Sequence, residues 1–162
     1  MNGTLNTLEI YEIAVQIEQN GARYYKRAAE MFDEPDISRI FIELMNWELK
    51  HKQLFSDMKK QHSESSPDTK AHESGHELLE AKVMAGLAVF GIRPNPSDEL
   101  SGKETISVVI KKAIENEKDS IVFYNGLKDF AFDDSAKEKI DEIIREELRH
   151  IKILSKVWQK TA

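Results

Sequence analysis

Four stretches of the chain place apolar residues with the period of an α-helix. Apolar side chains recur at positions i, i+3, i+4 and i+7, which puts them on one side of a helix and leaves polar residues on the other. The stretches run from Tyr11 to Phe32, from Ile37 to Met58, from Ile106 to Leu127 and from Ile140 to Val157. The pattern therefore predicts four amphipathic helices, each with an apolar side for packing against the others.

Short links separate the first stretch from the second and the third from the fourth. The residues around 33 to 36 and around 131 to 135 leave space for only a tight turn, so the helices of each pair must run antiparallel. A longer link, from about 60 to 103, joins the two pairs, and within it Glu77 to Phe90 predicts a short helix with an apolar side. We therefore expect an all-α fold, an antiparallel four-helix bundle of two αα-hairpins joined by one long crossover that contains a short helix.

Two of the helix starts carry capping signals. Pro35 interrupts the preceding structure, and Asp36 is expected to be the N-cap of the second helix. Ser135 followed by Glu138 forms a capping-box pattern, which predicts that Ser135 starts the fourth helix.

The apolar sides of all four helices contain ionisable residues, which rarely occur there. Each half of the chain carries a Glu, a Tyr seven residues later, and an E-x-x-H motif whose Glu lies thirty residues after the first Glu. The second copy follows the first at a constant offset of 99 positions. The repeated residues are Glu18, Tyr25, Glu48 and His51 in the first half, and Glu117, Tyr124, Glu147 and His150 in the second.

Four carboxylates and two imidazoles are the ligand set of a two-metal site. Residues three apart on a helix differ by about 60° in direction, so each E-x-x-H pair presents an oxygen and a nitrogen to one point. Four carboxylates in an apolar core repel one another, and two divalent cations remove that repulsion. A symmetric arrangement gives each ion one His and one terminal Glu, leaves two Glu to bridge, and keeps positions open for water, oxygen or peroxide. The expected ligands are Glu18, Glu48, His51, Glu117, Glu147 and His150.

Other readings of these residues stay open. A single E-x-x-H is more often an exposed ion pair, but two copies in register favour the metal site over a purely structural bundle, in which buried charges would be costly. Tyr25 and Tyr124 are either core tyrosines or groups that hydrogen-bond a ligand carboxylate or donate an electron or proton. Gly21 and Ser120, three residues after the lone Glu of each half, are close-packing positions or leave room beside the metal ions.

Composition narrows the chemistry further. The chain has no Cys, which excludes thiolate metal sites and cysteine nucleophiles, and oxygen and nitrogen ligands suit iron or manganese, although zinc and copper also bind them. A net charge of −6 and a pI near 5.4 argue against a nucleic-acid surface. No apolar run approaches the roughly 20 residues that span a bilayer, so we expect a soluble, cytoplasmic protein without membrane partners.

Two further glutamates, Glu115 and Glu146, lie close to the expected ligands in the sequence. We expect them to neighbour the site in sequence only.

On these repeated motifs the chain resembles a rubrerythrin-type member of the ferritin-like superfamily. The resemblance covers all four helices and implies a single domain over residues 1–162 with a non-haem di-iron centre on the six residues above. It also implies an oxidoreductase that reduces peroxide or oxygen, in a homodimer or a larger assembly.

Two features depart from typical rubrerythrins. Those proteins have a further carboxylate where this chain has Ser120, and many carry a Cys-rich rubredoxin module that a Cys-free chain cannot hold. An external electron-donor protein is therefore needed. The six-residue set resembles that of bacterioferritin at least as well, so the alternative is a ferroxidase for iron storage or handling.

Overall fold

The four predicted long helices are present and pack as an all-α bundle. The structure is a computed structural model and describes residues 7–65 and 100–161. The long helices are α1 (Thr7–Met31), α2 (Pro35–Ser65), α5 (Ile106–Leu127) and α6 (Asp134–Thr161), and a single 3₁₀ turn, η3 (Lys128–Phe130), follows α5. The predicted helix at Glu77 to Phe90 lies outside the described residues.

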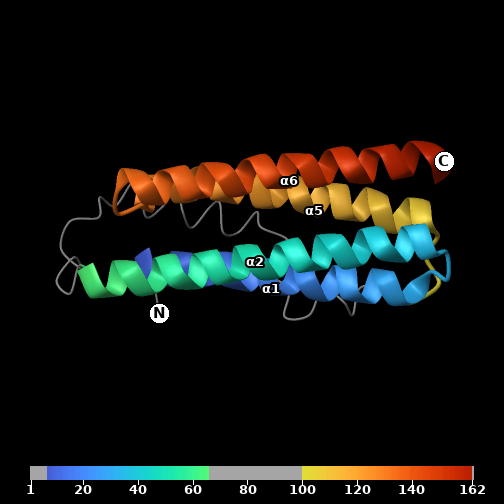
Figure 1. Cartoon of the computed structure of the whole chain (residues 1–162), viewed down its shortest axis with the longest axis horizontal. Coiled ribbons are helices and arrows are strands. Elements are labelled where there is room, and N and C mark those ends of the chain that lie inside the picture. Colours follow the sequence, from blue (N-terminus) through green and yellow to red (C-terminus); the bar gives the residue numbers. More distant parts are fainter. Residues whose placement is uncertain (1–6, 66–99, 162) are drawn as a thin grey trace, which may run out of the picture.

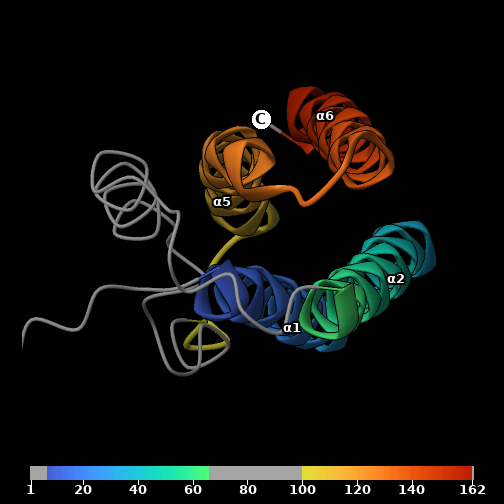
Figure 2. The same ribbon diagram turned by 90° about the vertical axis from the view of Figure 1, so that its left-hand side faces the viewer.

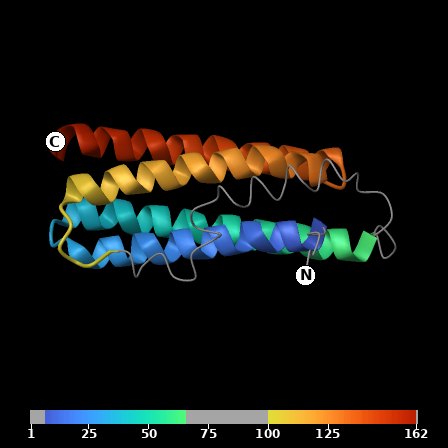
Figure 3. The same ribbon diagram turned by 180° about the vertical axis from the view of Figure 1, so that it is seen from behind.

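Two antiparallel hairpins lie side by side along their full length. In Figure 1 the pair α5 and α6 lies above the pair α1 and α2, and Figure 3 shows the same order from behind. The end view in Figure 2 places the four helices at the corners of a quadrilateral. The predicted pair of αα-hairpins is therefore confirmed, and the middle of each helix faces a common axis.

Aromatic and aliphatic side chains fill the space between the helices. The core holds buried tyrosines and phenylalanines from α1, α2 and α5, together with isoleucines and leucines from all four helices. Tyr24 of α1 donates a hydrogen bond to the carbonyl of Val109 in α5 at 2.8 Å, which satisfies a buried hydroxyl and ties the hairpins together. No helix within the described ranges is both long and apolar enough to cross a membrane.

Both capping expectations were wrong by one or two residues. Helix α2 begins at Pro35, whose missing N–H and fixed φ suit the first helical position, so Asp36 lies inside the first turn. At that position its negative carboxylate interacts favourably with the positive, N-terminal end of the helix dipole. At α6 the Oδ1 of Asp133 accepts from the backbone N–H of Ala136 at 2.7 Å, so Asp133 rather than Ser135 caps this helix.

Candidate metal centre

The six predicted ligands meet in the middle of the bundle. Each comes from the apolar side of its helix, and none has more than 3% of its surface exposed. Each hairpin supplies one lone Glu and one E-x-x-H pair. The residues that meet are Glu18 of α1, Glu48 and His51 of α2, Glu117 of α5, and Glu147 and His150 of α6, called the Glu/His cluster below.

The cluster divides into two overlapping groups, each able to hold one ion. In one group Glu18 and His51 join Glu48 and Glu147, and in the other Glu117 and His150 join the same two glutamates. Within each group one candidate ligand atom per residue lies within 4.8 Å of the others. Glu48 and Glu147 are therefore placed to bridge. We call the two places the Glu18 position and the Glu117 position.

Both histidines turn Nδ1 toward the carboxylates. His51 Nδ1 lies 2.7 Å from Glu147 Oε1 and 3.6 Å from Glu18 Oε2. His150 Nδ1 lies 3.1 Å from Glu147 Oε2, 3.3 Å from Glu48 Oε1 and 3.4 Å from Glu117 Oε1. The two rings stack at 5.8 Å between centroids. Nδ1 is thus the nitrogen through which each imidazole could bind an ion.

Several cluster atoms lack the hydrogen bonds that burial normally requires. Glu18 Oε2, Glu48 Oε1, His51 Nδ1 and Glu147 Oε1 are buried and make no hydrogen bond of acceptable geometry, although His51 Nδ1 and Glu147 Oε1 lie only 2.7 Å apart. Leaving such groups unsatisfied costs free energy, and two adjacent ions would supply the missing partners. The donor set of oxygens and imidazole nitrogens therefore fits divalent cations.

Crowding shifts the protonation of the cluster. Burial and the nearby charge of Glu147 raise the pKa of Glu18, and they raise the pKa of Glu117 to about 8. Burial and the charges of Glu18 and Glu117 raise the pKa of Glu48 well above its usual range. For Glu147, burial and the charge of Glu48 would raise the pKa, but its close contacts with Glu117 and both histidines lower it. Without a metal ion, carboxylates of the cluster therefore retain protons, and these protons reduce the repulsion between the carboxylates.

The histidines respond in the opposite sense. Burial alone would lower the pKa of His51, but the charge of Glu18 and the close approach of the Glu147 and Glu18 carboxylates raise it to about 12. The pKa of His150 is raised as well, because the close approach of the Glu117, Glu147 and Glu48 carboxylates outweighs its burial. Metal ions must therefore displace protons from both rings.

The two repeated tyrosines contact the cluster, each across the boundary between the hairpins. Tyr25 of α1 donates to Glu117 Oε1 of α5, and Tyr124 of α5 donates to Glu18 Oε1 of α1. Burial and the adjacent carboxylates raise the pKa of both phenols well above 10, so each remains a donor. Each tyrosine thus orients the lone Glu of the opposite hairpin, while an electron-transfer role stays a prediction.

The small residues differ between the two halves. An added Cβ at Gly21 would lie 2.7 Å from Glu48 Oε2, so the absent side chain makes room for this carboxylate. At the matching position Ser120 is buried, and its hydroxyl donates to the carbonyl of Asn116 at 3.0 Å. The space beside Gly21 is therefore occupied by a candidate ligand.

Two neighbours of the cluster were missed. Glu146 was expected to be close in sequence only, which is wrong, because its Oε2 lies 2.6 Å from His51 Nε2. The ring of Trp47 lies 6.2 Å from that of His51 and 6.3 Å from that of His150. Both lie on the α2 and α6 sides that face each other, which periodicity within one helix does not reveal. Glu115, by contrast, pairs with Lys118 at the surface, as expected.

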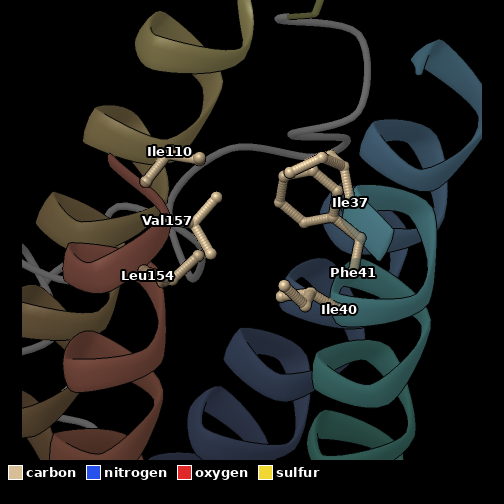
Figure 4. Close-up of a pocket in the computed structure, with 6 residues that line it drawn as sticks. All are labelled: Ile37, Ile40, Phe41, Ile110, Leu154 and Val157. Carbon is tan, nitrogen blue, oxygen red and sulfur yellow. The ribbon is translucent and has the colours of Figure 1, made fainter. Parts of the chain in front are cut away.

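A narrow apolar hollow lies toward the end of the bundle where α2 and α5 begin. Figure 4 shows its side chains facing one another from the two hairpins, and all are hydrocarbon. It offers no donor or acceptor and therefore no chemistry of its own. Its lining residues are Ile37, Ile40, Phe41, Ile110, Leu154 and Val157.

Comparisons with known proteins agree with this architecture. A family model described as rubrerythrin matches residues 9–158. A crystal structure of a proposed ferritin-like diiron-carboxylate protein from Thermotoga maritima superposes with a TM-score of 0.78 at 25% sequence identity, covering 100% of each chain. A search of curated proteins found no match. Because the family model covers nearly all of the four helices and the whole Glu/His cluster, the chain belongs to the rubrerythrin family of ferritin-like proteins.

Proposed function

We propose that this protein holds two iron ions in the Glu/His cluster and reduces peroxide or oxygen with electrons from an external donor protein. The observation that carries the proposal is the sharing of Glu48 and Glu147 between two groups that each have their own Glu and His. Shared carboxylates hold two ions close enough to act on one small molecule. A purely structural ion would need no such pair.

The chemistry requires two electrons. Reduction of hydrogen peroxide to two waters consumes two electrons and two protons, and two ferrous ions, when bound, each supply one electron. The residues of the chain hold and orient the ions. Glu18 with His51 would hold one ion, Glu117 with His150 would hold the other, and both tyrosines donate hydrogen bonds that fix the lone glutamates.

Iron is the metal proposed because of the ligand chemistry and the family. Carboxylates and imidazoles without sulfur suit iron and manganese, whereas zinc lacks the redox change that the reaction needs. The Thermotoga maritima structure, which has a similar fold, is named as a proposed ferritin-like diiron-carboxylate protein. The chain itself has no Cys to hold a rubredoxin-type iron site, which supports electron supply from another protein. A homodimer in the cytoplasm completes the proposal.

Peroxide consumption by reconstituted protein tests the proposal. The apoprotein is loaded anaerobically with two equivalents of ferrous iron, given a chemical reductant, and followed for loss of peroxide. We expect turnover above that of the same amount of free iron, and Glu147→Gln should abolish the excess because it changes a shared ligand. Glu142→Gln, an exposed change on the same helix, should leave it intact. Turnover no faster than free iron would refute the function.

A ferroxidase is the second candidate, favoured by one observation. Ser120 hydrogen-bonds the backbone instead of adding a carboxylate, so both positions keep the same kind of ligands, as in bacterioferritin. In that case iron would be the substrate. A hollow multi-subunit shell on gel filtration, with many iron ions per chain, supports this candidate, whereas a dimer that retains two ions per chain excludes it.

A further inference from the structure

The two metal positions differ outside the ligands themselves. We propose that Glu146 makes the Glu18 position bind its ion more tightly than the Glu117 position, so that the two fill in sequence. The inference rests on the proposed metal centre and adds to it an order of loading. Glu146 is a positioning residue here, because it acts on the ion through His51.

The hydrogen bond between Glu146 and His51 is the first piece of evidence. Glu146 Oε2 lies 2.6 Å from Nε2 of His51, whose Nδ1 faces the cluster. An imidazole that binds an ion through Nδ1 keeps its proton on Nε2, and here that proton is donated to the carboxylate. The bond runs from α2 to α6 and holds the ring in place from the opposite hairpin. Such a partner fixes the ring and makes it a stronger donor.

Within the described residues, the internal repeat gives His150 no carboxylate that matches Glu146. The offset of 99 pairs Glu146 with Trp47, and an indole has no acceptor for an imidazole proton. Among the described residues, every carboxylate within ion-pair distance of His150 approaches Nδ1. Trp47 instead packs half-buried beside both rings. The two metal positions therefore have similar ligands but differ at Nε2, the nitrogen of each histidine that does not face the cluster.

The expected difference in metal affinity follows from what carboxylate partners of metal-binding histidines usually contribute. Removing a carboxylate that orients a metal-binding His typically lowers metal affinity by about 10- to 100-fold. Both positions otherwise have one His, one lone Glu and the same two shared glutamates. We therefore expect the Glu18 position to be stronger than the Glu117 position by a factor in this range.

A stepwise titration with cobalt tests the inference. Apoprotein is titrated anaerobically with Co²⁺, whose visible absorption reports its coordination, and calorimetry measures the affinity of each step. The wild type should bind two ions in two steps separated by about 10- to 100-fold. Glu146→Gln keeps the shape of the side chain and removes its charge, so the first step should weaken toward the second while the second stays unchanged.

Controls separate this effect from a general loss of charge or fold. Glu142→Gln removes an exposed carboxylate one turn earlier on α6 and should leave both steps unchanged. Circular dichroism and melting of the apoproteins check that each variant keeps its helices. As a test without any variant, anomalous scattering from wild-type crystals with one equivalent of Co²⁺ should place the ion between Glu18 and His51.

The outcomes distinguish this inference from the function beneath it. Two equal steps in the wild type, equal weakening of both steps by Glu146→Gln, or a first ion between Glu117 and His150 would overturn the role of Glu146 and leave a two-metal centre standing. A wild-type protein that takes up neither Co²⁺ nor Fe²⁺ would remove the metal centre, and the order of loading with it.

Discussion

Gly21 offers a direct test of whether the Glu/His cluster is built to bind metal ions. In Gly21→Ala the new methyl group would lie 2.7 Å from Glu48 Oε2, whereas ordinary contacts begin at 3.4 Å. The carboxylate must then move by about 0.7 Å, several times the tolerance of about 0.2 Å in metal–ligand distances. Because Glu48 is shared by both positions, the substitution should weaken both ions.

The expected loss is at least about tenfold in metal affinity, which corresponds to about 1.4 kcal/mol. The stability of the metal-free protein should rise slightly or stay unchanged. Alanine is favoured over glycine in a helix interior by about 0.5–1 kcal/mol, and the flexible end of Glu48 can yield to the methyl group when no ion holds it. For a chain of this size that gain raises the melting temperature by about 1–4 °C at most.

The assay compares metal affinity and apoprotein stability in the same preparation. Affinity is measured by competition with a coloured chelator, and stability by thermal melting in the presence of excess chelator. Ser120→Ala is the matched control, because the Cβ is already present there and only the hydroxyl on the Asn116 carbonyl is lost. Wild-type affinity for two ions in Gly21→Ala would refute the reasoning, and so would a collapse of the metal-free protein.

Three further predictions follow from the same geometry. Tyr25→Phe and Tyr124→Phe each remove a hydrogen bond to a cluster carboxylate, which is worth about 1.5–3 kcal/mol, and each should lower metal affinity about tenfold. In the control Tyr24→Phe the lost hydrogen bond goes to a backbone carbonyl, so only the melting temperature should fall. In the metal-free protein the pKa of Glu117 is raised to about 8 from the usual 4.5, which stabilises the folded state below pH 4.5. This contribution is lost as the pH rises through 8. The melting temperature of the apoprotein should therefore fall between pH 5 and pH 9, and a rise would contradict the shift in pKa. Each metal ion removed from loaded protein should cost about 2.7 kcal/mol if free metal stood at 100 times the dissociation constant of its position. The melting temperature should therefore drop by about 5–10 °C per ion, and an unchanged melt would mean that the ions do not bind the folded cluster.

Sequence reasoning reached the fold and the cluster because both depend on position within single helices. Charges in the middle of an apolar stripe, such as Glu18 and Glu48, must point into the bundle, and the E-x-x-H spacing brings His51 to the same point. Four stripes and two short links leave few ways to pack. Burial of the six residues therefore follows from periodicity alone.

The features that sequence reasoning missed depend on how one helix faces another. Glu146 lies one residue before Glu147, about 100° around the helix, and the stripe does not say whether that side meets α2 or solvent. The same limit applies to Tyr25, whose partner is Glu117 of the opposite hairpin rather than Glu18 of its own helix. The start of α6 was misplaced because Asp133 and Ser135 both carry a capping oxygen, and the local sequence does not decide between them.

The exchange of hydrogen bonds between Tyr25 and Tyr124 has a consequence for how such a protein can arise. The hairpin of α1 and α2 carries one lone Glu, one Tyr and one E-x-x-H pair, and the hairpin of α5 and α6 carries the same set. Two identical hairpins related by a twofold axis would already supply six ligands and both crossed bonds. The chain therefore has the form expected of a duplicated and fused gene, and Glu146 and Trp47 are one pair of positions at which the two copies differ.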